Sequence, residues 1–304
     1  MIRNVEVKNL GPVKRWKANL AGLNFFIGPN ASGKSWVNMA LYIMVTASEK
    51  NIDEKLRSIF PVKKLKDIVS WGAEEAEVNV DDIVKLKIKG EEVYFSKDLD
   101  LRWDTNFISM PHQTLASIDF LTRLSETEYP EIHEAVWKNI VTGVEEKIGT
   151  KFSIKRNRMV ASFDGHELDI NYAAGGYKTF SLIYLALKRG IITPGGLVFI
   201  ENPEEHLHPE WQVIMAEVLV EMALKGVQLF VTTHSDYLIK VNNLMQEIPE
   251  LKEKVAAYLF TTEHPQRLVV DKRGIDLLPL IETFYKLYEE ELHLVMGEYD
   301  VHQM

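Results

Sequence analysis

The sequence contains no cysteine. This absence excludes disulfide bonds, thiolate nucleophiles and zinc sites that use sulfur ligands. Long apolar runs are lacking as well, because the longest, such as 195–200 and 227–231, fall far short of the about 18 residues that indicate a membrane span. The N-terminus also lacks the apolar core and the small-residue cleavage site of a signal peptide. We therefore expect a cytoplasmic protein with no membrane segment.

Internal repeats, low-complexity tracts and long heptad runs are also missing, so we expect no coiled-coil arm. What the chain does have is a high share of apolar residues, 46% of 304, against 26% charged residues. This composition predicts a globular protein with a large core. The formal net charge of -9 argues against a protein coated in nucleic acid, although it is compatible with a local basic face.

The spacing of apolar residues predicts strands and helices in two regular parts of the chain. The N-terminal part reads as strand, strand, loop and helix, over residues 2–7, 20–27, 28–35 and 36–47. The C-terminal part reads as helix, strand, helix and strand, over residues 177–189, 197–200, 209–225 and 227–231. Because strands and helices alternate there, we expect a parallel sheet.

The middle of the chain is mixed in character. Alternating apolar and polar residues between 74 and 98 predict a hairpin in a peripheral β-sheet, and helical spacing follows between about 114 and 149. Strands return over 152–170, around an Asp164-Gly165 turn. The tail at 282–298 has the pattern of an acidic amphipathic helix.

A phosphate-binding loop is the most specific motif in the sequence. Residues 28–35, GPNASGKS, match the pattern GxxxxGK[ST], follow an apolar strand and open a helix, which is the context that this loop requires. Its glycines let successive N–H groups face the phosphates of ATP, while Lys34 reaches the β and γ oxygens and Ser35 offers a hydroxyl to Mg²⁺. Trp36 stands where a small hydroxyl residue is commoner. The residues expected to bind ATP here are Asn30, Ala31, Ser32, Gly33, Lys34, Ser35 and Trp36.

An acidic residue, Glu201, ends the apolar strand at 197–200. This is the layout of a Walker B site, in which a carboxylate at the end of a strand holds Mg²⁺ directly or through water. We therefore expect Glu201 to lie beside the strand of the phosphate-binding loop. Ser35 and Glu201 are the predicted magnesium ligands.

Three segments together resemble a known family. They are the loop at 28–35, the run ENPEEHLHP at 201–209 and the stretch TTHSD at 232–236. In combination they are similar to the ABC-type ATPases of the overcoming-lysogenization-defect and RecF-like group. The resemblance implies an α/β P-loop NTPase with an ABC-type ATPase head, in which helices flank a mostly parallel central sheet, with a peripheral β-sheet and a helical lobe.

We expect the whole chain to form a single head of this kind. Its lobe I, the nucleotide-binding core, is predicted at about 1–60 and 190–304. Its lobe II, of mixed helical and β structure, is predicted at about 61–189 and carries the signature motif.

The resemblance gives a meaning to the stretch AAGGYK at 173–178, which stands where the family has its signature motif, just before a helix. In this family the signature of one subunit closes on the ATP of another. The resemblance therefore implies a homodimer induced by ATP, in which Gly175, Gly176 and Lys178 contact the nucleotide of the partner copy. The alternative is that the two glycines only start a helix.

His234 matches the family's switch histidine, which senses the γ-phosphate and the attacking water. His206 and His208 suggest a metal site shared with His234. The resemblance explains them instead as residues of the loop.

The chain departs from the family at the end of the acidic strand. Many ABC-type ATPases have Asp-Glu there, with the Glu as general base, whereas this chain has Glu201 and Asn202. An asparagine orients water but does not take its proton near neutral pH, and base catalysis is typically worth about 10²- to 10⁴-fold. We therefore expect slow hydrolysis, unless Glu204 or Glu205 substitutes as base. The candidate catalytic residues are Glu201, Asn202, Glu204 and His234.

Three functions stay open. The first is an ATP-gated dimer that acts as a switch with nucleic acid, a nuclease or another effector, as the resemblance to defence and repair ATPases implies. Only 70 residues follow His234, so we expect no Toprim nuclease domain of the kind that overcoming-lysogenization-defect proteins carry. The second function is the ATP-binding subunit of a transporter, and the run at 201–209 counts against it. The third is an ATP-dependent scaffold that regulates another protein without touching nucleic acid.

Contact with DNA would need a basic surface, because phosphate neutralisation dominates affinity. The alternating lysines between 85 and 89 point to one face of a strand. The candidate basic surfaces are Lys14, Arg15 and Lys17; Lys63, Lys64 and Lys66; Lys85, Lys87 and Lys89; and Lys155, Arg156 and Arg158.

Overall fold

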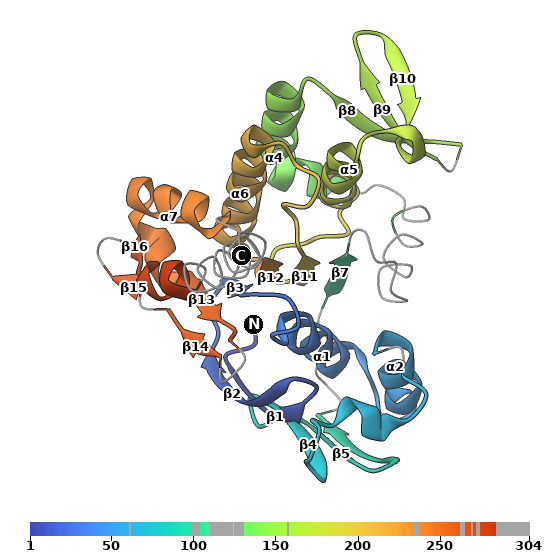
Figure 1. Ribbon diagram of the computed structural model, residues 1–304. Helices are drawn as coiled ribbons and strands as arrows, with labels where there is room; N and C mark the ends of the chain where they lie inside the picture. Colours follow the sequence, from blue (N-terminus) through green and yellow to red (C-terminus); the bar gives the residue numbers. More distant parts are fainter. Residues whose placement is uncertain are drawn as a thin grey trace, which may run out of the picture.

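A six-stranded sheet lies at the centre of the computed structural model (Figure 1). Its strand order is β14-β13-β3-β12-β11-β7, and neighbouring strands run parallel except for β13 and β14. The strands are β3 (Leu23–Ile27), β7 (Thr105–Ser109), β11 (Leu197–Glu201), β12 (Gln228–Thr233), β13 (Val255–Leu259) and β14 (Gln266–Arg267). The structure describes residues 1–60, 62–98, 104–109, 124, 131–156, 158–233, 237–261, 265–268, 270–271 and 274–283.

Alternate residues of each central strand face opposite sides of this sheet. In β3, for example, Leu23, Phe25 and Ile27 belong to one hydrophobic core and Phe26 to the other. The side chains of β3, β12 and β13 are buried along their whole length. Continuous apolar runs are typical of parallel strands that are covered on both faces, which explains why these segments show no polar alternation in the sequence.

Helices cover both faces of the central sheet (Figure 1). The core around Phe26 also contains α1 and α2, whereas the opposite core contains α4, α5, α6 and α7. The helix α6 begins with a proline, whose fixed φ suits the first helical position. The helices are α1 (Lys34–Thr46), α2 (Ile52–Ile59), α4 (Glu131–Ile148), α5 (Gly175–Lys188), α6 (Pro209–Leu224) and α7 (Tyr237–Glu247).

A five-stranded antiparallel sheet packs against α1, in the order β2-β1-β4-β5-β6. Its inner face is apolar and its outer face is charged, as the alternation in β5 shows: Leu86 and Ile88 are buried, whereas Lys85 and Lys89 are exposed. The structure thus confirms antiparallel strands within 74–98 and adds a third strand to the expected hairpin. The strands are β1 (Asn4–Leu10), β2 (Val13–Asn19), β4 (Glu75–Val80), β5 (Val84–Lys89) and β6 (Glu92–Lys97).

A three-stranded antiparallel sheet lies beside α5, with β9 between β8 and β10. Asp164 and Gly165 both have positive φ and form the predicted turn between β9 and β10. The strands are β8 (Lys151–Lys155), β9 (Arg158–Phe163) and β10 (His166–Asp169). The remaining elements are η1 (Leu65–Ile68), η2 (Ile170–Tyr172), η3 (Pro249–Glu253), β15 (Val270–Asp271) and β16 (Gly274–Ile275).

The expected fold class is confirmed: a mostly parallel sheet flanked by helices, with additional antiparallel sheets. The lobe boundaries stay a prediction. Within the range assigned to lobe II, β4 pairs with β1 and β7 pairs with β11. The helix predicted at 282–298 lies almost entirely outside the described residues. In the described part of the chain, every helix is too short or too polar to cross a bilayer.

Candidate nucleotide-binding site

The phosphate-binding loop joins β3 to α1 and has an unusual backbone. Gly28 has φ +146°, and a Cβ atom there would lie 2.1 Å from the carbonyl oxygen of Phe260, so only glycine fits. Ala31 and Gly33 also have positive φ, at 60° and 101°. Because the backbone curls in this way into the start of a helix, the loop fits a phosphate chain.

Lys34 is the buried cation of this loop, with 4% of its surface exposed. Its Nζ donates to the carbonyl oxygens of Gly28 and Pro29, each at 2.8 Å. Burial lowers the pKa of Lys34 to about 8, and the negative charges of Glu204 and then Glu201 act in the opposite direction. The lysine is therefore held over its own loop and interacts electrostatically with two carboxylates.

Ser35 and Trp36 follow Lys34 in the first turn of α1, and their side chains differ in their surroundings. Ser35 is half-buried on the helix that opens from the loop. The ring of Trp36 stacks on Phe60, with centroids 4.8 Å apart and an interplanar angle of 26°. A Cβ atom on Gly11 would meet the same indole at 2.4 Å. The side chain of Trp36 thus packs between the turn of the antiparallel sheet at Gly11 and the end of α2 at Phe60.

The carboxyl ends of three adjacent strands meet at the phosphate-binding loop. Thr233 of β12 is in register with Ile27, which precedes the loop, and Glu201 of β11 is in register with Thr232. The expectation that the Glu201 strand adjoins the loop strand was wrong, because β12 lies between β3 and β11. The parallel sheet nevertheless brings all three strand ends to one edge, where ligands of such sheets bind.

Asn202 is occupied by the turn that follows β11. Its backbone has φ +45°, a left-handed conformation that asparagine tolerates better than most residues. Its N–H donates to the Thr232 carbonyl at 3.0 Å, and its Nδ2 donates to Glu205 Oε1 at 2.9 Å. The hydroxyl of Thr232 donates to Asn202 Oδ1 at 3.4 Å. The amide that stands where a general base is expected thus bonds to side chains on either side of it, at Thr232 and Glu205.

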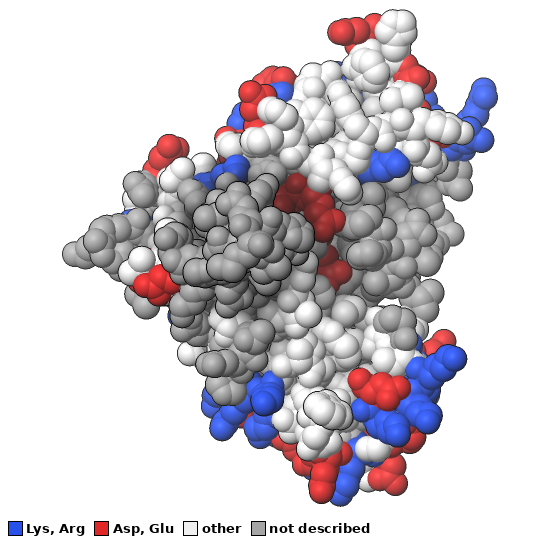
Figure 2. Space-filling view, viewed as in Figure 1, with Lys and Arg blue, Asp and Glu red and all other residues white. Residues whose placement is uncertain are grey.

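Glu204 is the buried carboxylate of the same turn, with 7% of its surface exposed. Its Oε1 accepts a hydrogen bond from the hydroxyl of Thr233. Its charge acts on Lys34 more strongly than that of Glu201. Figure 2 shows acidic side chains recessed in the middle of the drawn face, over the region of the central strands, while Lys and Arg side chains gather towards its edges.

The two glycines of the predicted signature open α5 and pack against the loop between β11 and α6. A Cβ atom on Gly175 would lie 2.6 Å from the Cβ of His206. One on Gly176 would lie 3.2 Å from the carbonyl oxygen of His206 and from Leu207 Cδ2. Lys178 is half-buried one turn later. These glycines therefore permit a close approach within the chain, towards the residues that follow Glu204, and their predicted contact with the nucleotide of a partner copy stays a prediction.

His234 lies outside the described residues, so its predicted role stays a prediction. His206 packs on Gly175, and His208 is the exposed residue before α6. Two participants in the site were missed by sequence reasoning: Thr233, which stands within the stretch TTHSD, and Phe260, whose backbone closes against Gly28. The threonine could have been found as the last residue of an apolar strand, whereas nothing in the sequence indicates the phenylalanine.

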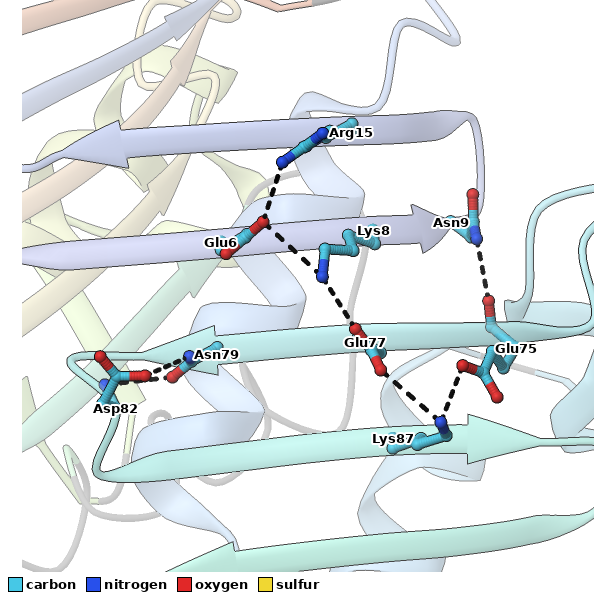
Figure 3. Close-up of polar contacts among 9 residues, drawn as sticks. All are labelled: Glu6, Lys8, Asn9, Arg15, Glu75, Glu77, Asn79, Asp82 and Lys87. Carbon is cyan, nitrogen blue, oxygen red and sulfur yellow. Dashed lines mark hydrogen bonds and ion pairs between the residues drawn. The ribbon is translucent and has the colours of Figure 1, made fainter.

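The candidate basic surfaces contain many acidic partners. On the outer face of the five-stranded sheet, Lys87 pairs with Glu75 at 2.7 Å and with Glu77 at 3.6 Å (Figure 3). Lys8 pairs with Glu77 at 3.1 Å, and Arg15 pairs with Glu6 at 3.6 Å. The lysines of β5 do share one face, as predicted, but carboxylates are interspersed among them. The face is a ladder of alternating charges rather than a basic stripe.

The sequence matches the family described as AAA ATPase domain over residues 1–102 and 111–239. This chain belongs to that family. The match includes the phosphate-binding loop, the acidic strand and the signature segment. No curated protein matches the sequence.

Solved structures of two SMC heads and of RecF have a similar fold. A structure of the SmcHead bound to the C-winged helix domain of ScpA has a TM-score of 0.60 at 13% identity, covering 88% of this chain and 96% of that one. An SMC head domain from Thermotoga maritima has a TM-score of 0.50 at 14% identity, covering 89% and 99%. The recombination mediator RecF has a TM-score of 0.51 at 12% identity, covering 88% and 98%. The fold of this AAA ATPase domain is thus that of an ABC-type P-loop ATPase head, as the resemblance predicted.

Proposed function

We propose that this ATPase is a switch in which two copies close around ATP and Mg²⁺ and open again after slow hydrolysis. The observation that carries the proposal is the meeting of three features at one sheet edge. A curled phosphate-binding loop holds Lys34, the end of β11 presents Glu201, and the turn after β11 presents Glu204. The Gly-Gly start of α5 rests on the loop that carries Glu204.

The residues predicted to bind phosphate and Mg²⁺ and to sense the γ-phosphate each have a place in this proposal. The backbone of residues 30–34 and the ammonium of Lys34 hold the phosphates. The hydroxyl of Ser35 and the carboxylate of Glu201 are oxygen donors of the kind that Mg²⁺ prefers, and they would hold the ion. When bound, the ion would neutralise charge on the β and γ oxygens. His234 would sense the γ-phosphate.

The second half of each site comes from the partner copy in this proposal. Gly175, Gly176 and Lys178 would cap the nucleotide of the other subunit, so that the dimer is twofold symmetric and each interface repeats the same contacts. The half-buried Lys178 would add a positive charge near the phosphates.

We propose that the switch acts on nucleic acid or on an effector protein in a defence or repair process. The similarity of fold to SMC heads and RecF favours this over the ATP-binding subunit of a transporter or a scaffold that does not touch nucleic acid. The head of an SMC protein was solved with part of ScpA bound, which illustrates how such a head can engage a partner protein. The paired charges on the outer sheet face favour a protein effector over a broad DNA-binding stripe there.

Light scattering of the purified chain tests the dimer. With Mg²⁺ and a non-hydrolysable ATP analogue, the mass should double, whereas with ADP it should stay that of one copy. Lys34→Ala should remain monomeric with the analogue, because it lacks the phosphate-binding cation. One mass in every nucleotide state, in a protein that binds ATP, would contradict the proposed closure.

A further inference from the structure

The missing carboxylate at position 202 raises the question of which group activates the water. Asn202 is a poor candidate on geometry as well as on chemistry. Both its backbone N–H and its amide group bond to Thr232 or Glu205, and its positive φ fixes the start of the turn. The amide of Asn202 is thus engaged by the side chains of Glu205 and Thr232.

The two carboxylates of the turn differ in where they are held. Glu205 accepts a hydrogen bond from Asn202 Nδ2 at 2.9 Å and is half-buried. Glu204 is 7% exposed and accepts its hydrogen bond from Thr233, which ends the strand next to that of the phosphate-binding loop. Of the two, Glu204 is the one whose charge acts on Lys34. The turn thus directs the Glu204 carboxylate towards the phosphate site, whereas the Glu205 carboxylate forms a hydrogen bond within the turn.

We propose that Glu204, positioned by Thr233, is the catalytic base of this ATPase and replaces the carboxylate that is absent at Asn202. The inference rests on the proposed function, because it assumes that ATP binds at the loop. In the step, the water oxygen bonds to the γ-phosphorus as the bond from that phosphorus to the β–γ bridging oxygen breaks. ADP leaves with the electron pair of the broken bond. Glu204 takes the proton of the water and later releases it to solvent.

Thr233 is a positioning residue in this proposal. Its hydroxyl donates to Glu204 Oε1 and so fixes the position of the carboxylate beside the end of β12. The register of β12 with β3 places Thr233 opposite Ile27, directly before the phosphate-binding loop. A rigid strand end therefore sets the distance between the base and the phosphates, which a flexible loop alone would not fix.

The test compares Glu204→Gln with Glu205→Gln. Both changes remove one negative charge from the same turn and keep the shape of the side chain, and a glutamine at 204 still accepts a hydrogen bond from Thr233. Phosphate release should fall about 10²- to 10⁴-fold in Glu204→Gln, the range of general base catalysis, and far less in Glu205→Gln. Calorimetric affinity for ATP with Mg²⁺ should be retained in both variants. The dimer formed with ATP should persist longer in Glu204→Gln, because the nucleotide is not consumed.

Three results would overturn the inference. Turnover in Glu204→Gln that equals that of Glu205→Gln would show that Glu204 is not the base. Loss of Mg²⁺-dependent ATP binding in Glu204→Gln would make it a metal ligand instead. A gain of about 10²-fold or more in Asn202→Glu would place the base site at 202. A wild-type chain that binds no ATP would refute the proposed function itself, so the two failures are distinguishable.

Two variants of Thr233 separate positioning from simple structural support. Thr233→Val keeps the shape but removes the donor, and it should lower kcat with little change in the KM for ATP. Thr233→Ser keeps the donor and should restore most of kcat. If Thr233→Val and Thr233→Ser lose kcat equally, or if KM changes instead of kcat, Thr233 has no role in positioning the base.

Discussion

A methyl group added at Gly175 should destabilise the protein by colliding with His206. The new Cβ would lie 2.6 Å from the Cβ of His206 and 2.8 Å from its Cγ. Carbon atoms in contact normally lie about 3.5–4.0 Å apart, so the overlap is close to an ångström. A different rotamer of His206 cannot remove it, because the Cβ atom moves only with the backbone.

The expected cost follows from the two effects of the substitution. Overpacking of this kind costs about 1–3 kcal/mol. Alanine is favoured over glycine in a helix interior by up to about 1 kcal/mol, and this gain is smaller at the first residue of α5. Gly175→Ala should therefore lower the free energy of unfolding by about 1–2 kcal/mol. Gly143→Ala is the matched control, because Gly143 lies within α4 and a Cβ atom there meets nothing within 4 Å, so this variant should be slightly stabilised.

A second substitution turns the experiment into a double-mutant cycle. His206 has φ +63°, a backbone conformation that glycine adopts without strain. His206→Gly removes the colliding Cβ and Cγ atoms, so Gly175→Ala should be tolerated in its presence. Urea unfolding of the four proteins should give a coupling free energy of about 1–2 kcal/mol between the two positions. A coupling near zero, or a Gly175→Ala variant as stable as the wild type, would refute the packing described here.

Two further predictions concern Lys34 and Tyr258. Lys34→Ala should weaken ATP binding about 10- to 150-fold by calorimetry, because charge-assisted hydrogen bonds contribute about 1.5–3 kcal/mol. The control is Lys55→Ala, which should leave ATP affinity unchanged, because the Lys55 Nζ bonds to the Thr46 carbonyl at the far end of α1. Unchanged affinity in Lys34→Ala would show that this lysine does not bind the phosphates. Burial raises the pKa of Tyr258 to about 12, so the unfolded chain loses this proton first and stability should fall as pH rises from about 10 towards 12. Tyr258→Phe should show a shallower fall in urea unfolding over that range, and an identical slope in both proteins would contradict the burial effect.

The sequence predicted the parts of the fold that depend on local patterns. Continuous apolar runs at 197–200 and 227–231 gave the strands β11 and β12 within two residues at each end, because buried parallel strands tolerate few polar residues. The start of α6 was correct because a proline marks it. Strand order could not be predicted from local patterns, since pairing partners are set by packing across the whole sheet. The position of β12 between β3 and β11 was therefore not expected.

The phosphate-binding loop could be predicted because its backbone needs glycine at fixed places, and the acidic strand end because a run of apolar residues stops there. The role of Trp36 could not be predicted, because stacking on Phe60 depends on how α2 returns to α1. The contact between Gly175 and His206 joins residues far apart in the sequence, and neither residue type indicates it.

Asn202 shows how the position of a residue in a motif and its backbone conformation give different accounts of its role. Position 202 follows the strand directly, so comparison by position assigns it the duty of a base and finds an amide instead. The backbone gives a different account. Asn202 has φ +45°, so the chain turns directly after β11, and its side-chain amide donates a hydrogen bond to Glu205. A residue at 202 in this conformation forms the start of the turn. The next buried carboxylate is that of Glu204, which accepts a hydrogen bond from Thr233. Asn202→Glu would lose the Asn202–Glu205 bond and would add a negative charge to a turn that already holds Glu204 and Glu205. We therefore expect this substitution to raise turnover little.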